Sequence, residues 1–169
     1  MKTSSVSIAF LSAITLVAGL VSPAMAETFK VPDKHPVVSV SFPDAWKPEE
    51  IERGVQGQSP DGAVYLSIEA SKSEKGMNEI IDGTFDMFKE HKVEIDKSSK
   101  KTNKMEIAGE PAEEMVFTGK DEDGPTVISI TTLTVGDHVI VISYWATAKL
   151  EEKNSPTIGK IVNSMKAIK

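Results

Sequence analysis

The sequence contains no cysteine in its 169 residues, and of its 19 basic residues only Arg53 is an arginine. The absence of cysteine excludes disulfides, thiol catalysis, thiolate metal sites and iron–sulfur clusters, as well as a lipidated cysteine anchor. Arginine is the side chain best suited to a bidentate grip on phosphate or carboxylate, and lysine replaces it poorly. A dedicated anion-binding site is therefore disfavoured.

The familiar motifs of catalysis and cofactor binding are missing as well. There is no Gly-rich phosphate loop and no His-Glu-x-x-His, and no metal-ligand spacing joins His35, His91 and His138. Residues 57–61 lack the second glycine of a nucleophile elbow, which disfavours hydrolase chemistry at that turn. Residues 121–124 do not fit the register of a calcium loop and predict a solvated hairpin turn. We expect no catalytic residue, no metal ligand and no cofactor.

The first 26 residues have the pattern of a signal peptide. Lys2 gives a positive start, residues 8–21 form an apolar run, and Ala24-Met25-Ala26 places small residues at the −3 and −1 positions of a cleavage site. The apolar run is shorter than the ~18 residues of a membrane-spanning helix. We expect cleavage after Ala26, a mature chain that begins at Glu27, and a periplasmic or secreted location without a stable membrane anchor.

Charge and length limit the partners and the domain count. The net charge is −6, and removal of residues 1–26, which hold one lysine and no acid, leaves −7. Nucleic acid is an unsuitable partner for such a chain, because neutralising phosphates needs a basic face. We predict an extended lead over residues 27–36, where Pro32 and Pro36 disfavour a helix, and a single domain over residues 37–169.

Apolar periodicity predicts three strands, a helix, about four strands and a second helix. Residues 138–147 are apolar on both faces, so both faces of the sheet should be covered. We predict an α+β fold with a single antiparallel sheet of about six to seven strands and helices on both faces, an α/β/α sandwich. The predicted strands are residues 37–42, 51–58, 63–70, 105–108, 112–118, 126–135 and 138–147, and the predicted helices are residues 74–92 and 156–167.

Two sets of side chains are candidates for contacts with a ligand or partner. Trp46 lies beside a predicted turn, where a large aromatic residue either lines a surface groove or packs into the core. Residues 97–104 predict a lysine-rich loop, which either meets an acidic partner or lipid headgroups or is simply solvated. The lysines of this predicted loop are Lys97, Lys100, Lys101 and Lys104.

The order of the predicted elements is similar to that of the PsbP-like α/β/α sandwich family. Phe42-Pro43-Asp44-Ala45-Trp46 at the end of the first strand and Ile161-Val162-Asn163-Ser164-Met165-Lys166 in the last helix carry the resemblance. The family includes extrinsic proteins of photosystem II, a nuclear Ran-binding factor and exported bacterial proteins of the DcrB kind. The resemblance implies a non-enzymatic binding or assembly-support domain, and it brings no catalytic residues.

Three functional hypotheses follow from these features. The first is an exported, non-catalytic binding or assembly-support domain of the bacterial envelope with an envelope protein as partner. The second is a carrier of a small ligand or lipid, with a pocket between sheet and helix near Trp46. The third is a cryptic hydrolase, which requires a histidine within hydrogen-bond reach of an acid or nucleophile in one cleft.

Overall fold

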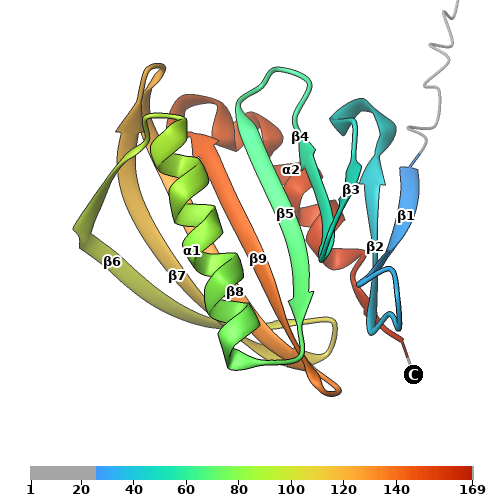
Figure 1. Ribbon diagram of the computed structural model, residues 1–169. Helices are drawn as coiled ribbons and strands as arrows, with labels where there is room; N and C mark the ends of the chain where they lie inside the picture. The colour runs from blue at the N-terminus through green and yellow to red at the C-terminus, as the bar shows by residue number, and fades with distance from the viewer. Residues whose placement is uncertain (1–25, 169) are drawn as a thin grey trace, which may run out of the picture.

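The computed structural model describes residues 26–168, which contain the helices and strands of Figure 1. Residues 1–25 of the predicted signal peptide lie outside this range, and Ala26 is the first residue of β1. The strands are β1 (Ala26–Val31), β2 (Val38–Pro43), β3 (Glu49–Ile51), β4 (Gly54–Gln58), β5 (Val64–Ser71), β6 (Glu94–Ile107), β7 (Glu110–Asp121), β8 (Gly124–Val135), β9 (His138–Thr147) and β10 (Lys166–Ala167). The helices are the 3-10 helix η1 (Asp44–Trp46), α1 (Glu74–Glu90) and α2 (Ala148–Asn163).

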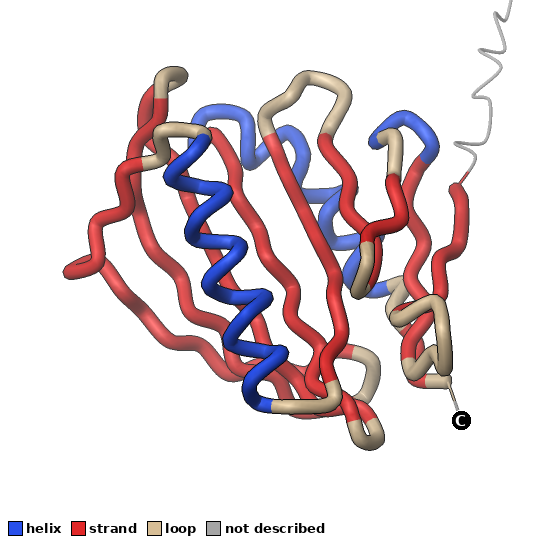
Figure 2. The backbone as a smooth tube through the Cα atoms, in the orientation of Figure 1, coloured by secondary structure: helices blue, strands red, loops and turns tan. Residues whose placement is uncertain are grey.

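A 7-stranded antiparallel sheet with the order β3-β4-β5-β9-β8-β7-β6 forms the centre of the molecule (Figure 2). Its middle is the hairpin of β8 and β9, in which Val135 pairs with His138 across the two-residue turn. Gly136 in this turn has a φ of 61°, a left-handed conformation that suits glycine in a two-residue hairpin turn.

The two faces of this sheet are covered by different elements. Helix α1 crosses one face, where Ile80 packs with Ile130 and Val141, and Phe88 packs with Ile128. Helix α2 lies on the opposite face together with a 3-stranded sheet of order β1-β2-β10. The strand β9 is therefore buried on both faces, as its two-sided apolar pattern predicts, and the α+β fold with helices on both faces is confirmed.

The small sheet is a difference from the single predicted sheet. The strand predicted at residues 37–42 is β2, and it pairs with β1 and β10 rather than with the large sheet. Residues 27–31 of the predicted lead belong to the strand β1, which buries Phe29 and Val31 in the core. These pairings join the two ends of the described chain, and no local pattern marks such distant contacts.

The second helix also differs from its prediction, because α2 begins at Ala148 and Pro156 lies inside it. Side chains hold the helix near its start and at its end. Asn154 Nδ2 donates to the carbonyl of Leu150 over 3.1 Å and to Asp61 Oδ1 over 3.3 Å. At the other end, the backbone N–H of Ser41 donates to Ser164 Oγ over 2.8 Å. These tertiary contacts outweigh the preference of proline for the first turn of a helix.

The lysine-rich loop predicted at residues 97–104 is wrong, because these residues belong to β6, a strand at the edge of the large sheet. Lys101 and Lys104 pair with Val116 and Glu113 of β7, and the register shifts between Asp96 and Lys101. The segment is polar on both faces because an edge strand that extends beyond the helices is solvated on both sides. Charged side chains and a bulge are typical protection for such an edge.

Candidate functional site

An open groove lies between the large sheet and α2. Its volume is about 340 Å³. The side chains of Val116, Val127 and Ile142 form the sheet wall, and Ile158 and Val162 of α2 form the helix wall. The groove is apolar along most of its length, and it is a hollow beside the packed core rather than a flat surface.

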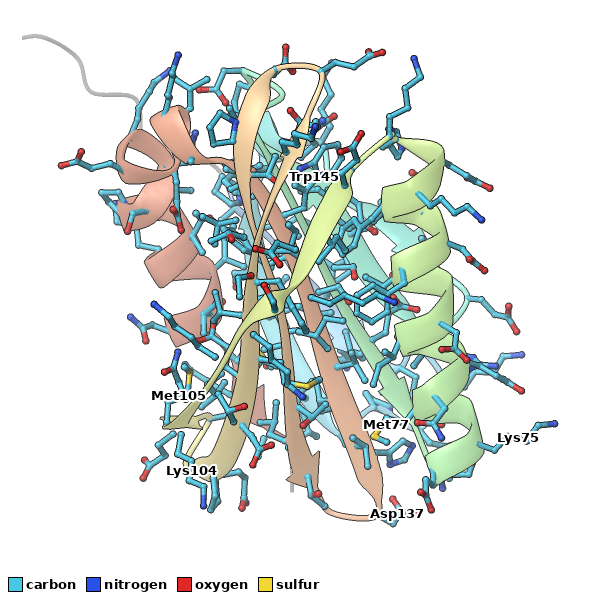
Figure 3. All side chains as sticks on the ribbon, turned by 90° about the vertical axis from the view of Figure 1, so that its left-hand side faces the viewer. Lys75, Met77, Lys104, Met105, Asp137 and Trp145 are labelled. Carbon is cyan, nitrogen blue, oxygen red and sulfur yellow. The ribbon has the colours of Figure 1, made fainter. Side chains whose placement is uncertain are left out.

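The open side of the groove is the edge strand β6. Met105 and Ile107 of β6 line the groove there. Met105 is 40% exposed, the largest exposed fraction among the big apolar side chains of the described residues. Figure 3 looks onto this edge and shows Met105 on the side of the sheet that faces α2. A flexible thioether at the mouth of an apolar groove adapts readily to ligands of different shape.

Two hydroxyl groups on β8 face the groove without a hydrogen-bond partner. Ser129 and Thr131 are 6% and 5% exposed and line the groove with alternate residues of the strand. Neither hydroxyl hydrogen-bonds a protein group within residues 26–168, although neither is sealed from the groove. A nearly buried hydroxyl without a partner is costly, so both are placed to bond a ligand or water.

Tyr144 and Glu151 form the polar end of the helix wall. The Tyr144 hydroxyl donates to Glu151 Oε1 over 3.1 Å, and Glu151 lies in the first turn of α2. Burial above all, then the charge of Glu151 and its hydrogen bond, and finally the charge of Glu114, hold the pKa of Tyr144 well above its usual range. Tyr144 therefore stays protonated, and it acts as a hydrogen-bond donor rather than as a base.

Glu114 brings a second carboxylate to the same groove. It lies on β7 directly opposite Thr131, and Asn103 Nδ2 donates to its Oε2 over 2.9 Å. Among the described residues that line the groove there is no lysine, arginine or histidine. Two carboxylates, two free hydroxyls and apolar walls give the groove the character of a binding site with a negative potential.

Trp46 does not line this groove. Its side chain is 3% exposed and packs edge-on against Phe42, with ring centroids 6.5 Å apart. It borders a separate surface depression together with Gln58 and Tyr65. A groove lies between sheet and helix, but Trp46 does not line it, because the turn carries this tryptophan into the core. The role of Trp46 as a contact for a ligand or partner stays a prediction.

The four lysines predicted as contacts are exposed and lie on β6. Lys97 and Lys100 belong to the bulged part of the strand, whereas Lys101 and Lys104 are in the paired ladder. Residues an odd number of positions apart on a strand point to opposite faces, so Lys101 and Lys104 face different ways. Within the described part of the chain, none of the four lysines forms an ion pair. Their role as contacts stays a prediction.

His91 and His138 lie too far apart to form a shared site. His91 caps the end of α1 beside Trp145, with ring centroids 5.4 Å apart, whereas His138 begins β9. Trp145 follows His138 by seven residues, about 23 Å along an extended strand, and Figure 3 shows Trp145 and Asp137 at opposite ends of the sheet. His91 and His138 therefore cannot serve one cleft.

The serine considered as a nucleophile has a structural role in its turn. Ser59 Oγ donates to Asp61 Oδ1 over 2.6 Å and accepts from the backbone N–H of Val64 over 2.9 Å. Both bonds tie the turn between β4 and β5, so the hydroxyl serves the turn. Within residues 26–168, no group of three or more histidine, aspartate or glutamate side chains is arranged to hold a metal ion.

Two polar residues in β8 indicate the groove in the sequence, although they were not among the predicted contact residues. Ser129 and Thr131 are small polar residues at alternate positions in the buried middle of β8, residues 128–131. Polar side chains on a face that points to the core mark either a hydrogen-bonded pair or a hollow. The contribution of α2 could not be read in the same way, because its true start at Ala148 lacks a side-chain cap.

No protein-family model matches the chain, and no curated protein sequence matches it. Three solved structures are similar at the level of fold. Cyanobacterial PsbP from Synechocystis sp. PCC 6803 has a TM-score of 0.54 at 10% identity, covering 89% of this chain and 96% of that one. LpqN, described as involved in cell envelope biogenesis of Mycobacterium tuberculosis, has a TM-score of 0.51 at 9% identity, covering 85% and 92% of the two chains.

A protein from Bacteroides thetaiotaomicron is the third, with a TM-score of 0.51 at 16% identity over 78% of this chain and 45% of that one. The chain therefore has the PsbP-like fold, as its element order predicts. Identities this low establish the fold alone. The closer resemblance to exported proteins of the DcrB kind stays a prediction. Among the described residues, no helix combines the length and apolar character needed to cross a membrane.

Proposed function

We propose that this protein is an exported, non-catalytic binding domain of the bacterial cell envelope and that the groove beside α2 is its ligand site. The observation that carries the proposal is the pair of unpartnered hydroxyls, Ser129 and Thr131, in the wall of an open apolar groove. An apolar cavity with a few convergent polar groups is the usual form of a small-ligand site. The signal-peptide pattern of residues 1–26 supports export.

The fold supports a binding role in the envelope by analogy. LpqN shares the PsbP-like fold, and a role in cell envelope biogenesis is attached to that protein. The high pKa of Tyr144 and the structural hydrogen bonds of Ser59 favour binding over nucleophilic chemistry. We therefore place a carrier or sensor of a small apolar molecule ahead of a hydrolase.

A neutral fluorescent probe, N-phenyl-1-naphthylamine, tests the groove as an apolar site. We expect the purified protein to enhance its fluorescence, and Val116→Trp, which fills the sheet wall, to weaken probe binding about tenfold. Thr118→Trp is the matched control, because Thr118 is an exposed residue on the same face of β7 outside the groove. Equal binding by the protein and the Val116 variant would exclude the groove as the site.

Export is tested separately from binding. When the full chain is expressed in a bacterial host, we expect the protein in the periplasmic or culture fraction with Glu27 as its first residue. Ala26→Arg should block cleavage, because the −1 position of the cleavage site requires a small side chain. Recovery of the uncleaved chain from the cytoplasm alone would contradict export.

A second candidate function is contact with an envelope protein through β6. This strand pairs only with β7 within the described chain, so its outer backbone edge is free, and its lysines are exposed. An acidic extended segment of a partner could add to such an edge, as in strand addition. Cross-linking in the envelope fraction should lose a defined partner when Lys97, Lys100, Lys101 and Lys104 are changed to glutamate.

The control for this experiment carries the same charge change elsewhere. Lys30, Lys149, Lys160 and Lys166 are also exposed, and their replacement by glutamate should leave the partner in place. Loss of the partner in both variants would point to overall charge instead of β6.

A further inference from the structure

We infer that the groove beside α2 binds a single-chain amphiphilic amine, with the ammonium group among Glu114, Thr131, Ser129 and Glu151 and the apolar body along the helix wall. This inference rests on the proposed function and names the class of ligand. A volume of about 340 Å³ lies near the lower end of the roughly 300–1,000 Å³ found for small-ligand sites. One alkyl chain or one small ring system fits that space, whereas a two-chain lipid does not.

Strand register brings the polar groups of the groove together in two adjacent rows. In the first row Asn103, Glu114 and Thr131 are successive partners across β6, β7 and β8. In the second row Ser129 is the partner of Tyr144, whose hydroxyl reaches Glu151. Directly opposite residues have Cβ atoms about 5 Å apart, and neighbouring rows on one face are about 7 Å apart. Glu114, Thr131 and Ser129 are therefore neighbours on one face of the sheet, and Glu151 lines the same groove from α2.

The carboxylates retain unused acceptor capacity. Glu114 accepts from Asn103 through Oε2, and Glu151 accepts from Tyr144 through Oε1, so each has a second oxygen without a bond within the described chain. Neither carboxylate is neutralised by a described ion pair. A carboxylate with a free oxygen beside apolar walls attracts a cation more strongly than it would in open water.

The hydroxyls complete the match to an ammonium group. A primary ammonium has three donors and no acceptor. The groove offers it carboxylate oxygens together with the Ser129 and Thr131 hydroxyl oxygens, which lack protein partners. A carboxylate or phosphate head group would instead meet two like charges. Lys101 lies two residues before Asn103 on β6 and points to the same face of the sheet. It is exposed, and it forms no ion pair with Glu114 in the described chain.

Three probes with the same chain length test the inference by competition with N-phenyl-1-naphthylamine. They are n-octylamine, 1-octanol and octanoate. We expect the amine to bind about tenfold more tightly than the alcohol, and the alcohol more tightly than octanoate. An amine that binds no better than the alcohol would overturn the inference and leave the apolar groove intact. Failure of all three probes and of the fluorescent probe would overturn the proposed function as well.

Glutamine variants assign the preference to the two carboxylates. Glu114→Gln with Glu151→Gln should abolish the preference for n-octylamine over 1-octanol, and the ratio of the two affinities is the quantity to measure. Glu113→Gln is the matched control, because Glu113 neighbours Glu114 but points to the opposite face of β7. An amine preference that survives in the double variant, or disappears in the control, would place the cation elsewhere and contradict the assignment.

Discussion

The hydroxyl groups of Thr84 and Ser143 lie 2.9 Å apart where α1 crosses β9. Thr84 Oγ1 also donates its proton to the carbonyl of Ile80 over 3.0 Å, so the bond between the two hydroxyls is donated by Ser143. Ser143 is fully buried and has no other described side-chain partner. The pair therefore depends on Thr84 as acceptor.

The direction of this hydrogen bond predicts unequal effects of mutation. Ser143→Ala removes a donor but leaves Thr84 bonded to Ile80, and should lower the free energy of unfolding by about 1 kcal/mol. Thr84→Val leaves the buried Ser143 hydroxyl without a partner and should cost about 2 kcal/mol. The double variant should be more stable than Thr84→Val alone. Urea unfolding at neutral pH measures all three, and equal losses for the single variants would contradict this direction.

Asp61 predicts an acid-sensitive contribution to stability. Hydrogen bonds from Lys153 and Ser59 hold its pKa well below the ordinary value of 3.8. The unfolded chain therefore takes up this proton first as the pH falls. The stabilisation is complete above the unfolded pKa and is lost as the pH falls from there through the folded pKa. The gap in unfolding free energy between the protein and Asp61→Asn should be present at neutral pH and shrink in this acid range.

The partner of Asp61 supplies a check on this explanation. Lys153 Nζ lies 2.8 Å from Asp61 Oδ2 and links the turn between β4 and β5 to α2. In the Lys153→Met background, Asp61→Asn should change the unfolding free energy less, and the change should depend less on pH. Part of the effect should remain, because the hydrogen bond from Ser59 is still present. A gap that does not change with pH in either background would show that Asp61 is not the titrating group.

Gly83 predicts a stabilising substitution. It lies on an exposed position of α1, and a Cβ atom there would meet nothing within 4 Å. Glycine inside a helix costs about 1 kcal/mol relative to alanine, because it loses more backbone freedom on folding. Gly83→Ala should therefore raise the unfolding free energy by about 0.5–1 kcal/mol. Thermal unfolding followed by circular dichroism should show a higher midpoint temperature for the variant. A lower midpoint temperature would show that a methyl group at this position is not accommodated.

Gly54 predicts the opposite result from the same substitution. It begins β4, and a Cβ atom there would collide with the backbone oxygen of Ile68 on β5. Backbone cannot move aside as a side chain can, so the ladder between the two strands would have to separate locally. Gly54→Ala should lower the unfolding free energy by about 3 kcal/mol. A loss under about 1 kcal/mol would mean that the strand pair accommodates the methyl group.

Local turn chemistry explains which parts of the fold could be predicted from the sequence. The strand β9 is confirmed residue for residue over 138–147, because its turn and its two-sided apolar pattern agree. Its hairpin partner β8 begins at Gly124, two residues before the predicted start. The helix α1 is confirmed with a shorter end, since its apolar stripe and the Ser73 cap act locally. The strand β6 was not predicted as one strand, because its pairing with β7, and not an apolar face, makes it extended.

The groove lies at the limit of what the sequence can indicate. Ser129 and Thr131 signal a hollow or a polar pair in β8, but the second wall belongs to α2, whose position depends on Ser41 and Asp61 far away in the chain. The predicted carrier pocket was placed near Trp46 because of the nearby turn, and the groove beside α2 lies elsewhere. That this protein carries a ligand stays a prediction. Contacts between distant segments are set by packing and not by periodicity.

Two hydrogen-bond contacts that hold α2 in place affect the free energy of ligand binding to the proposed groove. Asn154 holds the helix to Asp61, and Ser164 holds it to Ser41. Because α2 is already held in place, a ligand that binds in the groove we propose would not have to order it, and little conformational entropy would be lost on binding. Loss of either contact would let α2 move relative to the sheet, and binding would then be weakened by the fraction of molecules whose helix is out of place.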